Sequence, residues 1–132
     1  HFLRRNRSRT SPEFAPTKEQ ECTCDQWKQK YEGLRHEAAC AAFLRDRGYD
    51  AIARIIEVHG LMLPSPSRKT VEQKMLFYAD KRVAVDTIVS LDERFADLRK
   101  RYGDGSENSN AQMWYEEARR IETELFAGDV PV

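Results

Sequence analysis

The chain has 132 residues, with 22 Lys or Arg and 22 Asp or Glu, so its formal net charge is zero. Such a balance gives no overall positive electrostatic potential that would attract nucleic acid or anionic lipid. The length suits one domain with a modest core. No apolar stretch reaches the roughly 18 residues of a membrane span and no signal peptide is predicted, so we expect neither a membrane nor a nucleic-acid partner.

The first half of the chain predicts a tail followed by three helices. Pro12 and Pro16 interrupt any helix after a run of arginines, so we expect residues 1–16 to form a flexible basic tail. Thr17 has Gln three positions later, which is the spacing of a capping box. The three helices are expected over about 17–32, 35–47 and 50–59.

The second half predicts a proline-containing loop over 61–69 and helices that a polar turn over 103–110 interrupts. Thr70 and Ser90 are each followed three residues later by Gln or Glu, so both are predicted to open capping boxes. The helices are expected over about 71–84, 91–102 and 111–127.

Every apolar run in these segments has a period near 3.6 and none alternates with a period of two. We therefore expect an all-α protein, a compact bundle of about five to six helices formed by residues 17–128. The last two helices should supply much of its core. Their predicted inward stripes are Leu91, Phe95, Leu98 and Tyr102, and Trp114, Ala118, Ile121 and Leu125.

Asp80 lies in an otherwise apolar helical face. Leu76 and Phe77 precede it by four and three positions and Val83 follows it by three, which turns the carboxylate toward the predicted core. A buried carboxylate without a partner costs several kcal/mol. It needs a Lys or Arg, which is the structural explanation, or a base or metal ion, which is the functional one.

His36 and His59 are predicted to lie on buried faces in the same way, because each shares an apolar stripe of its helix. A single histidine in such a stripe is usually a core residue. Two histidines and an aspartate facing inward suit a divalent ion such as Mn, Fe, Zn or Mg with a phosphate-like substrate.

Five stretches of the chain, with a terminal helix, share a pattern with one superfamily. They are HEAA at 36–39, FLRDRGY at 43–49, IARIIEVHG at 52–60, EQKMLFYADKRV at 72–83 and VSLDERF at 89–95. The chain from His36 to Phe126 therefore resembles the C-terminal part of HD-domain proteins, metal-dependent phosphohydrolases named for a His-Asp doublet.

The resemblance implies a hydrolase of a phosphate ester or nucleotide-like substrate, with divalent Mn, Mg, Fe or Zn as cofactor. It implies Asp80 as the last ligand of the principal metal, and His36 and His59 as ligands of a second metal or contacts of the substrate phosphate. Asp80 and Lys81 are then the candidate catalytic residues. Lys81 and its neighbour Arg82 are expected to bind either substrate phosphate or, in the structural explanation, acidic side chains at Glu72 and Asp86.

The chain departs from the family pattern at its N-terminal side. It has no His-Asp dipeptide, and the nearest analogue is Cys24-Asp25, which makes Asp25 a further candidate metal ligand. We expect the N-terminal ligands of the family to be missing or replaced. The three cysteines form no disulfide framework, so reduced thiols and a cytoplasmic location are expected.

Two other functions stay open. The chain is either an inactive HD-like helical domain that binds a partner or dimerises, or a plain helical interaction module in which the His and Asp side chains are structural. An absent N-terminal helix would leave an apolar face uncovered. We therefore expect the chain to self-associate, as a homodimer, or to swap its N-terminal helix with another copy.

Overall fold

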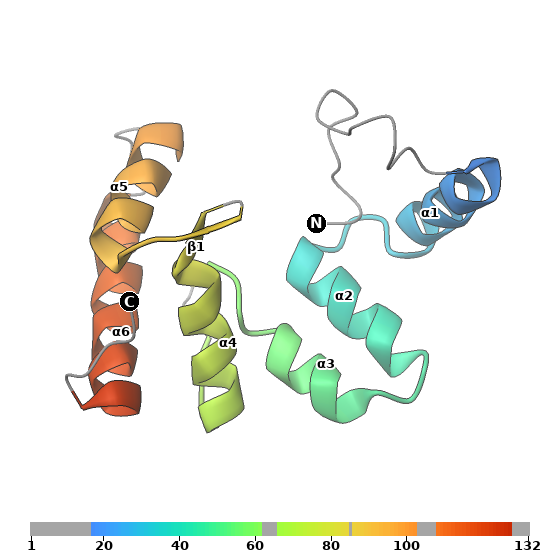
Figure 1. Ribbon diagram of the computed structural model, residues 1–132. Helices are drawn as coiled ribbons and strands as arrows, with labels where there is room; N and C mark the ends of the chain where they lie inside the picture. Colours follow the sequence, from blue (N-terminus) through green and yellow to red (C-terminus); the bar gives the residue numbers. More distant parts are fainter. Residues whose placement is uncertain (1–16, 62–65, 85, 103–107, 128–132) are drawn as a thin grey trace. The chain divides into compact units, whose positions relative to one another are not determined.

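The computed structural model describes residues 17–61, 66–84, 86–102 and 108–127, which form six α-helices and one short β-hairpin (Figure 1). The predicted tail over 1–16 and residues 103–107 of the predicted turn lie outside the described residues. The rest of the predicted turn, 108–110, is wrong, because these residues already belong to the last helix. The all-α class is confirmed. The elements are α1 (Lys18–Lys30), α2 (His36–Arg45), α3 (Asp50–Ile56), α4 (Val71–Lys81), β1 (Val83–Ala84), β2 (Thr87–Ile88), α5 (Leu91–Tyr102) and α6 (Asn108–Phe126).

The chain divides into two compact units, residues 1–53 and 54–132, and each is described by itself. The first unit contains α1 and α2. The second contains α4, the hairpin, α5 and α6, and the boundary falls within α3.

The starts of α1, α4 and α5 follow from local sequence, as predicted, whereas α3 and α4 end about three residues earlier than predicted. Ser90 shows the chemistry of a helix start: its N–H donates to the Glu93 carboxylate over 2.8 Å, and its hydroxyl accepts from the Glu93 N–H over 3.2 Å. These bonds satisfy N–H groups that have no partner inside the helix. Gly48, in the turn after α2, has a φ of +79°, which a residue with a Cβ rarely adopts. All three predicted capping boxes are present: Thr17 with Gln20, Thr70 with Gln73, and Ser90 with Glu93.

Aromatic side chains join α1 to α2 in the first unit. The rings of Trp27 and Phe43 meet edge to face with their centroids 4.8 Å apart, and the Tyr31 ring lies 6.4 Å from that of Phe43. The Tyr31 hydroxyl donates to the Asp46 carboxylate over 2.6 Å, just beyond the end of α2. The edge-to-face ring contacts pack the two helices together, and the Tyr31 hydroxyl keeps a hydrogen-bond partner in the packed state.

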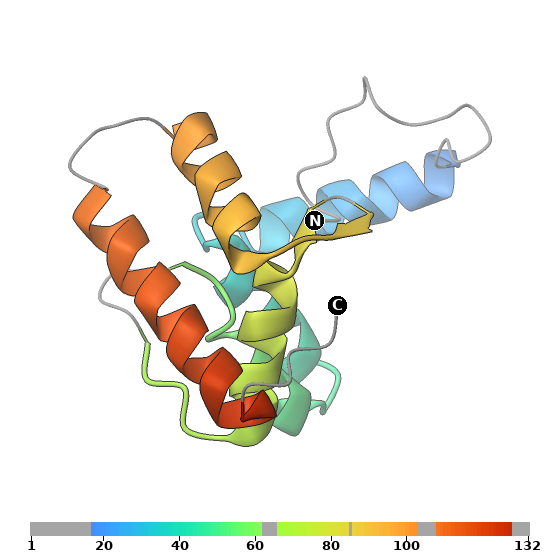
Figure 2. The same cartoon turned by 60° about the vertical axis from the view of Figure 1, so that its left-hand side comes forward.

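The core of the second unit is an apolar cluster from three helices that lie side by side (Figures 1 and 2). Phe77 of α4, Phe95 of α5 and Ile121 of α6 are fully buried in it. Both predicted stripes are confirmed for their described side chains, although the side chain of Tyr102 lies outside the description. The cluster is formed by Phe77, Tyr78, Leu91, Phe95, Ala118 and Ile121, with Leu98, Trp114 and Leu125 packed against it.

The expectation that the chain has no strand is wrong at one place. The segment predicted to continue the helix to residue 84 leaves it at Lys81 and forms an antiparallel hairpin, in which Val83 pairs with Ile88. Its base is closed by Arg82, whose backbone C=O accepts from the Val89 N–H over 2.8 Å and whose Nε donates to the Val89 C=O over 2.7 Å. Strands of two residues are too short to give a period-two pattern in the sequence.

Arg68 ties the loop before α4 to two helices. Its side chain is 1% exposed, and Nη1 lies 2.5 Å from a carboxylate oxygen of Glu117 on α6. Nη2 donates to the C=O of Gly60 over 2.9 Å, and the guanidinium lies 3.7 Å from the centre of the Phe77 ring on α4. Charge-assisted bonds of this kind are stronger than neutral ones, and burial removes the competing water.

Replacing Arg68 should therefore destabilise the second unit. We expect Arg68→Ala to lower the free energy of unfolding by about 3 kcal/mol or more, because it leaves the Glu117 carboxylate without its buried partner. Urea unfolding followed by circular dichroism measures this change. Arg99→Ala, at an exposed position of α5, is the control and should change it by less than about 0.5 kcal/mol. Equal effects of the two substitutions would show that Arg68 is not a structural tie.

Candidate functional site

The buried position that the sequence predicted for Asp80 is occupied by its neighbour Lys81. The Asp80 side chain is 43% exposed, whereas that of Lys81 is 4% exposed. The face of α4 that packs inward contains Phe77, Tyr78 and Lys81, which are separated by three and four positions. The expectation of a buried Asp80 is therefore wrong, because the prediction used Val83 as part of the inward face, and Val83 belongs to the hairpin and is exposed.

Lys81 is a buried cation beside an aromatic ring. Its ammonium contacts the Asp80 carboxylate and lies 5.0 Å from the centre of the Phe77 ring. Burial lowers the pKa of Lys81 below its ordinary value of 10.5, and the Asp80 carboxylate opposes this effect. The positive charges of Arg94 and Arg68 lower the pKa of Lys81 further.

We call Arg68, Lys81 and Arg94 the cationic cluster. Arg68 comes from the loop before α4, Lys81 from the last turn of α4 and Arg94 from α5. Nη1 of Arg94 lies 3.5 Å from the Asp97 carboxylate, which is a long contact for an ion pair. Burial also lowers the pKa of Arg68, and the Glu117 carboxylate raises it. The sequence analysis missed Arg68 and Arg94 as site residues, because a loop arginine has no periodicity and Arg94 adjoins a stripe predicted as ordinary core.

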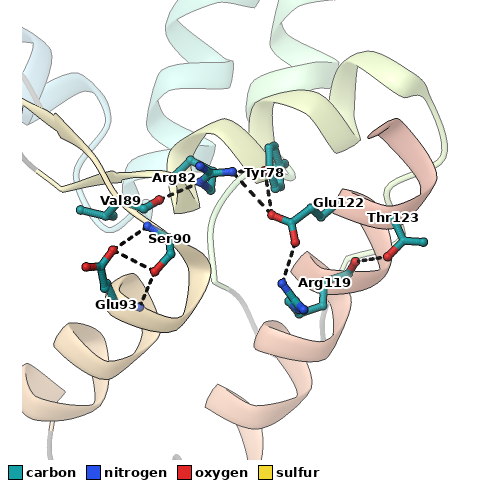
Figure 3. A network of polar contacts seen from close by, with 8 residues as sticks. All are labelled: Tyr78, Arg82, Val89, Ser90, Glu93, Arg119, Glu122 and Thr123. Carbon is teal, nitrogen blue, oxygen red and sulfur yellow. Dashed lines mark hydrogen bonds and ion pairs between the residues drawn. The ribbon is translucent and has the colours of Figure 1, made fainter. Parts of the chain in front are cut away.

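A second polar network lies on the α6 side of α4 (Figure 3). The Tyr78 hydroxyl donates to the Glu122 carboxylate over 2.9 Å and accepts from the Arg82 guanidinium. Arg82 lies 3.5 Å from Glu122, and Arg119 approaches the other oxygen of that carboxylate at 2.8 Å. Burial and the Glu122 carboxylate raise the pKa of Tyr78. Arg82 is thus paired with an acidic side chain, as the structural explanation required.

The expected acidic partners, Glu72 and Asp86, are replaced by others. Lys81 pairs with Asp80 and Arg82 with Glu122. Glu122 lies 44 residues from Tyr78, and the packing of α6 against α4 brings it to this place. No local spacing in the sequence could indicate this contact.

The two histidines differ from the prediction in different ways. His36 is exposed at the first position of α2, so the expected burial of its imidazole is wrong; the buried residues of α2 are Glu37, Ala39 and Ala41. His59 is half-buried in the turn after α3, and its Nδ1 lies 2.5 Å from the C=O of Ile56.

The four predicted metal ligands fall in both units. Asp25 is exposed on α1, where Lys28 lies 2.8 Å from its carboxylate, and with His36 it belongs to the first unit. His59 and Asp80 belong to the second. Neither unit by itself supplies more than two of them. Within the described part of the chain, no group of three or more His, Cys, Asp and Glu side chains is placed to hold a metal ion.

The donor set around Asp80 suits a metal ion poorly. A divalent ion bound to this carboxylate would have to displace the Lys81 ammonium or lie beside it, and two like charges at such a distance repel each other. The metal site therefore stays a prediction of the resemblance.

Comparisons with known proteins assign no family. No protein-family model matches the chain, and neither a curated protein nor a solved structure matches it. The resemblance to HD-domain proteins is untested by these comparisons. Among the described helices, none is both long and apolar enough to cross a membrane.

The lowered pKa of Lys81 predicts a dependence of stability on pH. The folded state releases this proton at a lower pH than the unfolded state, so just below 10.5 the unfolded chain binds more protons and stability from this site rises with pH. Comparison with Lys81→Met isolates the effect. We expect the free energy of unfolding of the wild type, relative to that variant, to increase as the pH rises toward 10.5.

Urea unfolding at several pH values measures this difference. Lys100→Met removes an exposed lysine of α5 and controls for the loss of a surface charge. A free energy of unfolding of the wild type that falls, relative to that of Lys81→Met, as pH rises would contradict the burial of a charged Lys81.

Proposed function

We propose that this chain is a helical interaction module that associates through an apolar stripe on α4 and the hairpin, and that the Asp80–Lys81 pair is structural. Of the functions that the sequence left open, this one is best supported by the geometry. The observation that carries it is a row of large apolar side chains that remain exposed although the core of the second unit is complete without them.

The apolar stripe consists of exposed residues of α4 and of the hairpin. Val71, Met75 and Ala79 are spaced four positions apart along the exposed side of α4, which ends at Lys81, and the exposed Val83 is the first residue of β1. Val83 pairs with Ile88 across the hairpin, which continues the stripe onto β2. Exposure is 55% for Val71, 53% for Met75, 41% for Val83 and 67% for Ile88.

Single exposed apolar residues are ordinary on protein surfaces, but several large ones on adjoining elements form a patch that is typical of an interaction site. The opposite side of α4 is already occupied, because Phe77 and Tyr78 pack in the core. The stripe is therefore not needed by this core, and contact with another apolar surface would remove it from water at a gain of about 25 cal/mol per Å².

A second copy of the chain is the partner that the shape of the stripe favours. Large side chains lie toward both of its ends, and the small Ala79 lies near its middle. Two copies related by a two-fold axis near Ala79 would approach closely at the centre and bury the larger residues of each end against the other copy. An isologous interface needs this kind of self-complementary surface.

Substitution in the stripe should abolish association. We expect the wild type to show a mass that rises toward that of a dimer with concentration, and Met75→Asp to weaken association by at least about tenfold, because it places a charge in the apolar contact. Size-exclusion chromatography with light scattering measures both. Met113→Asp is the matched control, since Met113 is exposed to 38% but lies on α6. A wild type that stays monomeric at every concentration would refute the dimer.

A metal-dependent phosphohydrolase of HD type, acting on a phosphate ester or nucleotide-like substrate, is the second candidate. One observation favours it: the Asp80 carboxylate is 43% exposed, so a metal ion could reach it from solvent. Lys81 would then be displaced from Asp80 and freed to contact a phosphate. The resemblance implies Mn, Mg, Fe or Zn for this site.

Metal content separates the two functions. For an interaction module we expect elemental analysis to give well under about one equivalent of these metals per chain, no metal-stimulated cleavage of a generic phosphate ester, and no change of either in Asp80→Ala. Asp86→Ala removes another exposed aspartate of the same unit and is the control. Stoichiometric metal that is lost in Asp80→Ala alone would establish the hydrolase instead.

The cysteines bear on the compartment. Cys22 is exposed, Cys24 and Cys40 are half-buried, and all three are free thiols. We place the protein in a reducing compartment, the cytoplasm, where such thiols persist.

A further inference from the structure

A polar groove of about 580 Å³ lies in the second unit, between α6 and the loop before α4 that runs beside it (Figure 2). Its volume is within the roughly 300–1,000 Å³ of sites that bind small ligands. One wall is formed by residues 66–68 of the loop and Lys74 of α4. The other is one face of α6, with residues three or four positions apart: Met113, Glu116, Glu117 and Arg120.

Two ion pairs hold the walls of this groove together. Nη1 of Arg68 lies 2.5 Å from the Glu117 carboxylate, and the Lys74 ammonium contacts the Glu124 carboxylate. Glu117 and Glu124 are two turns apart on α6, which is about 10 Å along the helix axis. Because the walls are joined at both places, the groove exists before a ligand arrives, and a ligand does not bear the cost of ordering it.

The α6 wall carries one negative and one positive charge that these ion pairs do not use. The exposed Glu116 carboxylate accepts a hydrogen bond from the neutral Gln112 amide over 2.9 Å, which leaves its charge unbalanced. Arg120 is exposed and forms no ion pair with another described residue. The two residues are four positions apart, so they lie on the same side of α6 and about 6 Å apart along its axis.

We propose that the groove binds a short peptide, with the N-terminal ammonium of the peptide on Glu116 and its C-terminal carboxylate on Arg120. An extended chain of two residues spans about 7 Å, so a dipeptide is long enough to reach both charges. A simple anion would leave Glu116 unbalanced, and a simple cation would leave Arg120 unbalanced. The Met113 side chain, which lines the groove, offers an apolar surface to a side chain of the peptide. The groove is separate from the apolar stripe, and its occupation does not depend on self-association.

Carbon-13 spectra of the methionine methyl groups in the full chain test this binding. We expect titration with the dipeptide glycyl-leucine, at neutral pH and constant ionic strength, to shift the Met113 methyl signal along a saturable curve. Met75 is exposed on the outer side of α4 and does not line the groove, so its methyl signal should stay unshifted. N-acetyl-glycyl-leucine lacks the ammonium and glycyl-leucine amide lacks the carboxylate. Each should bind at least about tenfold more weakly than the dipeptide, because it loses one charge-assisted contact.

Two variants assign each end of the peptide. Arg120→Gln should remove the preference for the dipeptide over its amide, and Glu116→Gln should remove the preference over the acetylated form. Both replace exposed residues, and Arg99→Gln, at an exposed position of α5, is the control that should keep both preferences. Equal shifts of the two methyl groups, no saturation, binding of free leucine as tight as that of the dipeptide, or unchanged preferences in the variants would overturn the proposal. These outcomes are independent of the mass measurements that test the dimer.

Discussion

The second unit depends on the burial of positive charge against the ring of Phe77. Arg68 and Lys81 both lie against this ring, and each is almost fully removed from water. Such burial is costly unless the charges are paired, and the pairing with Glu117 and Asp80 connects a loop, α4 and α6 around one aromatic residue. The apolar cluster from the three helices supplies the remaining packing. These directional ion pairs fix the position of the loop relative to the helices. Apolar contacts are not directional and would fix it less precisely.

The same constraint determines what the candidate site can do. Because the inward position at the end of α4 holds a lysine and not an aspartate, the core presents donors and positive charge, not carboxylate ligands. That chemistry is poorly suited to a metal ion, because Asp80 is already the counter-ion of Lys81. The exposed side of α4 carries apolar residues that the core does not use. Helix α4 thus has a buried charged residue, Lys81, at its C-terminal end and exposed apolar residues along its outer side.

Much of the fold was predictable because its causes are local. Capping boxes at Thr17, Thr70 and Ser90 involve residues three positions apart, and the inward stripes of α5 and α6 follow from a period of 3.6. The site was less predictable. An error of about one position in the inward face of α4 was enough to exchange Asp80 for Lys81, since adjacent helical residues point about 100° apart. A lysine can bury its aliphatic stem while its ammonium pairs with a carboxylate, so the residue type at position 81 did not indicate that this side chain is buried.

By itself, the sequence determined the helical class, where the capped helices α1, α4 and α5 begin, and which sides of α5 and α6 are apolar, because these depend on neighbours within one or two turns. Only the tertiary structure decided that α4 gives way to a hairpin after Lys81, that Arg82 pairs with Glu122, and that a loop arginine is buried. Those outcomes depend on side chains tens of residues apart along the chain. Their energies arise only when α6 packs against α4 and excludes water from the charges between them.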